Sequence, residues 1–296
     1  MHILSATQFT PPFIDALFEH TMNIEKYPHC FHGVLRGKIL LNVFFEPSTR
    51  TSLSFESAMK QLGGDVINFN HSVSSMIKGE SYEDTIRTLA TYGHIMALRD
   101  PEVNNIHVAS TMLKMPLING GNGSGEHPTQ ALLDLYTIYK TFNSINDKKI
   151  MFVGDVKNSR TVHSLINLLH LYPTNQIFFM CYDNCEPEME FLERINRIHD
   201  KPCEVINLQT DFSDIDVVYC TRYQRERVQK DGEQKCVIDV EFMRRLKPDA
   251  IVMYPLPRNS EIDPRVDNDK RCVYFEQMRN GVELRKVLLL KCFDKW

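Results

Sequence analysis

A regular alternation of apolar, strand-like segments and amphipathic helices constrains the fold more than any other feature of this 296-residue sequence. The alternation begins with a predicted strand at residues 38–45 and a helix at 51–62, whose apolar residues follow the helical period. It begins again with a strand at 149–153 and a helix at 161–171. Segments that alternate in this way form parallel sheets with helices on both faces. The sequence therefore predicts an α/β fold with two doubly wound domains, each a mainly parallel sheet covered by helices.

The other predicted elements extend both series. Further strands are expected at 66–69, 94–98, 117–119, 177–182, 205–208, 217–220 and 251–254. Further helices are expected at 81–92, 127–142, 187–199, 240–246 and 275–293. The helix at 127–142 is long enough to join two halves of the chain. We expect one domain from residues 1–130 plus 280–296 and the other from residues 131–279.

Charge, hydropathy and cysteine spacing exclude several classes of protein. The formal net charge is −4 and no lysine- or arginine-rich tract is present, so we expect no nucleic acid partner. No apolar run approaches the roughly 20 residues that cross a bilayer, and the N-terminus does not resemble a secretory signal. The eight cysteines form no CxxC pair, and Cys181 and Cys185 lack a second pair at metal-ligand spacing. These features predict a cytoplasmic protein with reduced thiols, no metal and no membrane association.

The residues of greatest chemical interest lie where the predicted strands end. In doubly wound sheets, ligands bind at the carboxyl ends of the strands, so these positions are the first candidates for a functional site. The residues at these positions are Ser48 to Thr51, Arg99, His127, Arg160, Arg222, Pro255 and Leu256.

The segment from Phe44 to Thr51, FFEPSTRT, is the strongest single signal. A strand ends, a proline turns the chain, and three hydroxyls with one guanidinium stand where a helix begins. The first amides of a helix lack internal partners and carry partial positive charge, so this segment is suited to bind phosphate. The alternative is an ordinary helix cap, which needs one hydroxyl and no arginine. We favour anion binding.

Seven segments, in order along nearly the whole chain, resemble the motifs of the transcarbamoylases, the aspartate/ornithine carbamoyltransferase family. The FFEP start of the first is typical of the aspartate enzymes in that family. The segments are Phe44–Thr51, Ser74–Glu80, Arg99–Pro101, Gly125–Gln130, Gly154–Ser164, Thr221–Arg227 and Pro255–Arg258.

The resemblance implies a transferase that joins the carbamoyl group of carbamoyl phosphate to the amine of L-aspartate, the committed step of de novo pyrimidine biosynthesis, with no cofactor. It implies that residues 1–130 plus 280–296 bind carbamoyl phosphate and that residues 131–279 bind aspartate. It also implies a homotrimer in which Ser74 and Lys78 reach a neighbouring subunit's site; the sequence does not indicate whether a regulatory chain associates. The implied carbamoyl phosphate ligands are Ser48, Thr49, Arg50, Thr51, Ser74, Lys78, Arg99, His127 and Gln130. The implied aspartate ligands are Lys78, Arg160, Arg222, Gln224, Pro255 and Leu256. The implied catalytic residues are Arg50, Thr51, Lys78, Arg99 and His127.

General chemistry is consistent with these roles. Amine attack on a carbonyl places negative charge on its oxygen, which fixed donors such as His127, Arg50 and Thr51 would stabilise. A dicarboxylate substrate suits the planar, bidentate cations of Arg160 and Arg222. The phosphate that leaves would accept the amine's proton, so neither a metal nor a covalent nucleophile is required.

Simpler interpretations and rival functions remain open. His127 could be only a helix-start residue, Lys78 a solvated loop lysine and Arg222 a surface charge. Tyr254 stands where a histidine is common in the family, and it is the departure nearest to the chemistry. The rival functions are an ornithine carbamoyltransferase, a nicotinamide enzyme and a binder without turnover. The chain lacks the His-Cys-Leu-Pro motif of the first and the Gly-x-Gly-x-x-Gly fingerprint of the second.

Overall fold

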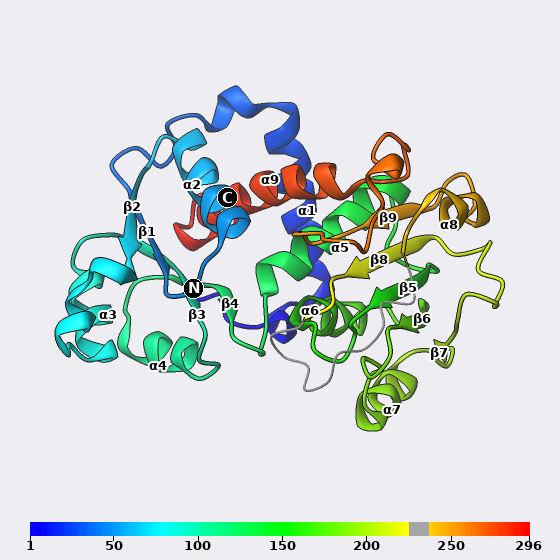
Figure 1. The fold of residues 1–296 in the computed structure, drawn as a ribbon. Coiled ribbons are helices and arrows are strands. Elements are labelled where there is room, and N and C mark those ends of the chain that lie inside the picture. The colour runs from blue at the N-terminus through cyan, green and yellow to red at the C-terminus, as the bar shows by residue number, and fades with distance from the viewer. Residues whose placement is uncertain (225–236) are drawn as a thin grey trace. The chain divides into compact units, whose positions relative to one another are not determined.

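The computed structural model describes residues 1–224 and 237–296 (Figure 1). The chain forms two compact units, which are described separately. Unit 1 consists of Met1–Leu133 and Arg279–Trp296, and unit 2 is Asp134–Met278. In the described part of the chain, no helix is both long and apolar enough to cross a membrane.

The sheet of unit 1 has four parallel strands in the order β2-β1-β3-β4 (Figure 1). The strands are β1 (Ile39–Phe44), β2 (Asp65–Asn70), β3 (Ile95–Asp100) and β4 (Leu117–Asn122). β1 and β3 lie in the middle, and their near-continuous apolar runs are buried, as expected for strands covered on both faces. β2 is an edge strand with mostly exposed residues.

The helices of unit 1 include two that the sequence did not predict. α1 (Pro11–Lys26) begins with prolines at its first two positions and buries Ile14, Leu17 and Ile24 on one face. Proline is well suited to the first turn of a helix, so the Pro-Pro pair was a start signal that we did not use. The second unpredicted helix is α4 (Asn105–Met112). The remaining helices and helical turns are α2 (Thr49–Gln61), α3 (Tyr82–Ala90), η1 (Ala6–Gln8), η2 (Pro28–Phe31), η3 (His71–Val73) and η4 (Ser75–Lys78).

The sheet of unit 2 has five parallel strands in the order β7-β6-β5-β8-β9. The predicted strand at 205–208 is wrong in extent: β7 is only Glu204–Val205, because the chain turns at Asn207, whose carbonyl accepts from the Thr210 amide at 3.1 Å. The other strands are β5 (Lys149–Gly154), β6 (Gln176–Cys181), β8 (Val217–Thr221) and β9 (Ile251–Met253). The helices and helical turn are α6 (Arg160–Leu169), α7 (Met189–Ile198), α8 (Val240–Arg245) and η6 (Pro264–Val266).

Two long helices contribute residues to both units. α5 (Pro128–Phe142) and α9 (Tyr274–Cys292) each contain a unit boundary. The prediction of an α/β fold with two helix-covered parallel sheets is confirmed.

Each sheet has one point where the strand order reverses. In unit 1 the chain leaves β1 toward β2 and then returns to the other side of β1 with β3. In unit 2 it leaves β5 toward β6 and β7 and returns on the other side with β8. Ligands of doubly wound folds bind outside the carboxyl ends of the strands at such switch points. The fold therefore provides one favoured binding position in each unit, next to β1 and β3 and next to β5 and β8.

Candidate functional site

The start of α2 lies at the switch point of unit 1. Ser48 is the N-cap residue, with an extended backbone (φ −155°), but its side chain makes no capping hydrogen bond within the described part of the chain. Thr49 and Arg50 follow in the first turn and are exposed, whereas Thr51 is buried. The capping interpretation therefore does not account for the Ser48 hydroxyl, and the first amides of the helix can bind an anion.

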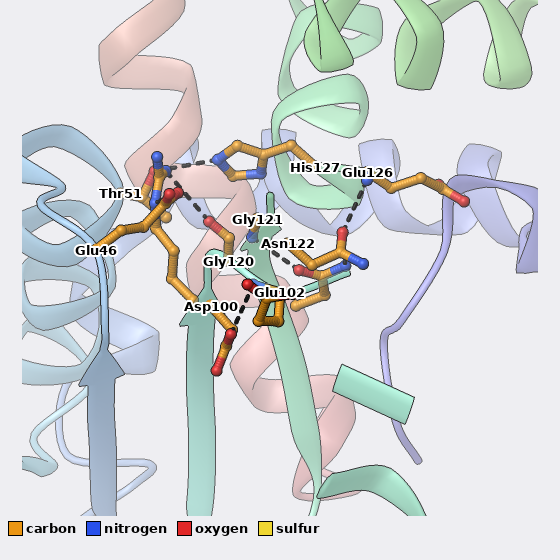
Figure 2. Close-up of polar contacts among 11 residues, drawn as sticks. Glu46, Thr51, Asp100, Glu102, Gly120, Gly121, Asn122, Glu126 and His127 are labelled. Atoms are coloured by element: carbon orange, nitrogen blue, oxygen red, sulfur yellow. Dashed lines mark hydrogen bonds and ion pairs between the residues drawn. The ribbon is translucent and has the colours of Figure 1, made fainter. Parts of the chain in front are cut away.

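His127 contacts this helix start. Its Nε2 lies 3.2 Å from Oγ1 of Thr51, and only 5% of Thr51 and 4% of His127 are exposed (Figure 2). Thr51 belongs to the first turn of α2, and His127 immediately precedes α5. The structure therefore brings together two predicted site residues that are 76 positions apart in the sequence.

The loop before His127 is held by a hydrogen-bond network that the sequence did not reveal. The Glu126 amide donates to Oδ1 of Asn122 at 2.7 Å, next to His127 (Figure 2). The Glu126 carboxylate in turn accepts from the Ser5 hydroxyl at 2.7 Å and from the Ala6 amide at 2.6 Å. The N-terminal segment thus fixes the peptide that carries His127.

Arg99 stands at the end of β3, beside the end of β1. Its Nε lies 2.6 Å from Oε1 of Glu46, and its Nη1 donates to the Gly120 carbonyl at 3.5 Å (Figure 2). The neighbouring Asp100 is buried, which raises the pKa of its carboxyl, and it accepts from the Glu102 amide at 2.8 Å. Arg99 is therefore positioned by Glu46, which follows β1, and by Gly120 in β4.

The other predicted residues of unit 1 fall into two places. Gln130 is buried in the first turn of α5, three residues after His127. Ser74 donates to the His71 carbonyl at 2.9 Å, and Lys78 is exposed in η4. Neither Ser74 nor Lys78 is hydrogen-bonded to the residues at the switch point, as far as the chain is described.

We call the following set the N-terminal cluster: Ser48, Thr49, Arg50, Thr51, Arg99, His127 and Gln130.

The corresponding position in unit 2 lies after β5. Gly154 has φ of +112°, and a Cβ there would lie 2.2 Å from the Thr221 carbonyl oxygen, so only glycine fits. Ser159 lies within 3.0 Å of the hydroxyls of Thr161 and Thr221, and Arg160 is the first residue of α6. The start of α6 is therefore tied to the end of β8.

Asp155 joins the two segments that carry the predicted aspartate ligands. This fully buried carboxylate accepts from the Asn158 amide at 3.1 Å and from the Gln224 amide at 3.0 Å. Asn158 precedes Arg160, and Gln224 follows Arg222. Our sequence reasoning gave Asp155 no role, because a buried acceptor of backbone amides cannot be recognised without the fold.

Pro255 and Leu256 follow β9, the neighbour of β8. Leu256 has φ of +56°, which is unusual for a residue with a branched side chain. Backbone strain of this kind is typical of functional sites. We call Arg160, Arg222, Gln224, Pro255 and Leu256 the C-terminal cluster. The remainder of the predicted Thr221–Arg227 motif, residues 225–227, lies outside the described residues.

No group of three or more histidine, cysteine, aspartate or glutamate side chains in the described ranges could hold a metal ion. The fold and the two clusters define a doubly wound α/β protein in which predicted ligand residues lie at the carboxyl ends of the strands in each unit.

Comparison with known proteins identifies the family. Residues 1–140 match the family model described as aspartate/ornithine carbamoyltransferase, carbamoyl-P binding domain, and residues 146–292 match the Asp/Orn binding domain. The chain belongs to the aspartate/ornithine carbamoyltransferase family. The predictions of this family and of a transferase are confirmed.

Several individual relatives are named as aspartate carbamoyltransferases. The chain is 39% identical to the aspartate carbamoyltransferase catalytic subunit of Finegoldia magna, over 98% of this chain and 97% of that protein. It is 40% identical to the multifunctional protein pyr1-3 of Dictyostelium discoideum, where the match covers 99% of this chain but spans only 13% of the relative's length. The crystal structure of aspartate transcarbamoylase from Trypanosoma cruzi in complex with carbamoyl phosphate is similar with a TM-score of 0.91 and 38% identity, over 97% of this chain and 95% of that one.

Proposed function

We propose that this protein transfers the carbamoyl group of carbamoyl phosphate to L-aspartate, giving N-carbamoyl-L-aspartate and phosphate in the committed step of pyrimidine biosynthesis. The observation that carries the proposal is the contact between Thr51 and His127 at a helix start that is suited to bind an anion. Family membership and the two arginines of the C-terminal cluster support the same reaction.

The N-terminal cluster would bind carbamoyl phosphate. Hydroxyls and amides at the start of α2, with Arg50, suit the phosphate. Thr51 and His127 are placed to donate to the carbonyl oxygen, on which negative charge develops during amine attack. Arg99 would contact the phosphate and carbonyl side, and Gln130 would hold the carbamoyl amide.

The C-terminal cluster would bind aspartate. Arg160 and Arg222, with Gln224, would hold the two carboxylates, because guanidinium groups match carboxylates in bidentate pairs. The carbonyls of Pro255 and Leu256 would orient the amine. The phosphate that leaves would take the amine's proton. In this assignment residues 1–130 plus 280–296 form the carbamoyl phosphate-binding domain, and residues 131–279 form the aspartate-binding domain.

The same proposal includes a cytoplasmic homotrimer in which Ser74 and Lys78 complete a neighbour's site, with Lys78 contacting both substrates. Lys78 is exposed in η4, so its side chain is accessible to a neighbouring subunit. We expect light scattering to give a mass of three times the 34.4 kDa chain. A mass of one chain at assay concentration would contradict the shared site.

A turnover assay with carbamoyl phosphate tests the reaction directly. It is run in parallel with L-aspartate and L-ornithine, and carbamoylated product and phosphate are followed together. We expect product and phosphate in equal amounts with aspartate only. Product with ornithine only would mean that the arginines of the C-terminal cluster do not bind the acceptor. Tight carbamoyl phosphate binding without product from either would identify a binder without turnover.

A further inference from the structure

Two buried side chains of unit 2 contact the turn that follows β9. Tyr254 is 1% exposed and Glu261 is 2% exposed. The Tyr254 hydroxyl lies 3.0 Å from the Pro257 carbonyl oxygen and 3.2 Å from Oε2 of Glu261, so its single proton faces two acceptors. A hydrogen bond from the Tyr254 hydroxyl, just before the turn Pro255–Leu256, to the Pro257 carbonyl, just after it, therefore closes the turn.

Glu261 connects this turn to the segment after β8. Its Oε2 accepts from the Asn259 amide at 2.7 Å, and its Oε1 accepts from the Tyr223 amide at 3.3 Å. Tyr223 stands between Arg222 and Gln224, two members of the C-terminal cluster. One buried carboxylate thus binds both segments that carry the proposed aspartate ligands.

The other side of Tyr254 is also fixed. Its amide donates to Oε1 of Gln277 at 2.8 Å, and Nε2 of Gln277 donates to Oδ1 of Asp134 at 2.6 Å. The second oxygen of Asp134 accepts from the Tyr219 hydroxyl at 2.8 Å. All four side chains are fully or almost fully buried. A phenol anchored in such a network has little freedom, so the position of the Pro257 carbonyl is set by the core.

The turn needs this support because Leu256 has the left-handed φ of +56°, which a leucine adopts only when its surroundings enforce it. Burial, followed by the charges of Cys220 and Glu261, raises the pKa of Tyr254 far above its ordinary value, while the Arg222 charge acts in the opposite direction. The phenol is therefore a neutral donor at neutral pH.

We propose that Tyr254 and Glu261 are positioning residues: Tyr254 holds the Pro255–Leu256 carbonyls where they orient the amine of aspartate, and Glu261 couples that turn to Arg222 and Gln224. This inference rests on the proposed function. Tyr254 occupies the position where a histidine is common in the family.

The test compares aspartate with succinate, which keeps both carboxylates but has no amine. Wild type is assayed first with aspartate, and turnover there establishes the proposed function separately. For Tyr254→Phe we expect kcat/KM for aspartate to fall at least about tenfold, since small misplacements of a reacting group cost up to ~10²-fold. The inhibition constant of succinate in the presence of carbamoyl phosphate, and the KM for carbamoyl phosphate, should stay within about twofold.

Glu261→Gln is expected to behave differently. Because Glu261 also accepts from the Tyr223 amide, kcat/KM for aspartate should fall and the inhibition constant of succinate should rise. Tyr254→His keeps a ring donor and should recover part of the loss in Tyr254→Phe. Tyr27→Phe, which changes an exposed phenol of unit 1, is the matched control and should leave all constants unchanged.

Two results would overturn the proposal. If kcat/KM of Tyr254→Phe for aspartate stayed within twofold of the wild-type value, the phenol would not position the turn. An equal loss of aspartate turnover and succinate affinity in Tyr254→Phe would mean that the residue supports the carboxylate site rather than the amine.

Discussion

His127→Ala is expected to lower kcat by about 10²–10³-fold while the KM for carbamoyl phosphate changes little. Removing one donor from a developing oxyanion typically has an effect of this size. The structure supports the role because Nε2 of His127 and Oγ1 of Thr51 are 3.2 Å apart, buried, and converge from two helix starts. Steady-state kinetics with aspartate in excess would measure the change.

The controls for this variant separate chemistry from folding. His107→Ala removes an exposed imidazole from α4 in the same unit and should leave kcat unchanged. The melting temperature of His127→Ala, measured with saturating phosphate, should stay close to that of wild type. If the substitution raised the KM for carbamoyl phosphate and left kcat intact, His127 would bind the ground state and the transition state equally and would not stabilise the oxyanion selectively.

The fold was predictable from sequence wherever the hydrophobic period was clear. The buried strands β1, β5 and β8 are short apolar runs bounded by turn signals, and each was found within two residues of its observed ends. The length of β7 was overestimated because an apolar run does not show that a turn at an asparagine will end the strand. α1 was missed because the two prolines in its first turn, which are a start signal for a helix, were not used.

The candidate site was predictable only where its residues form local motifs. The helix start at Ser48 to Thr51 and the position of His127 could be read from adjacent residues. The groups that hold them could not, because they come from distant segments. Arg285 in α9 is an example: it is buried and donates to Ser54 at 2.8 Å and to Thr129 at 3.2 Å, across 231 and 156 residues of sequence. Nothing in the local pattern around Arg285 indicates that it supports both α2 and α5.

Arg222→Met should lower kcat/KM for aspartate by about 10³-fold. Truncating one partner of a desolvated, hydrogen-bonded charge pair costs roughly 2–5 kcal/mol, and about 4 kcal/mol corresponds to about 10³ in affinity. Arg222 follows the buried Thr221, and the two residues after it, Tyr223 and Gln224, donate their amides to Glu261 and Asp155, so the guanidinium stands on a fixed backbone. Arg222→Lys should recover only part of the loss, because an ammonium cannot make a bidentate pair.

The pattern of constants in Arg222→Met is as informative as the size of the loss. The KM for carbamoyl phosphate should be unchanged, and succinate should lose affinity in parallel with aspartate, because both present the same carboxylates. Arg244→Met, which removes an exposed arginine paired with Glu241 on α8, is the matched control and should leave turnover intact. If Arg222→Met kept its affinity for succinate, the carboxylates would be held elsewhere, and Arg160 and Gln224 would have to account for the recognition of the acceptor.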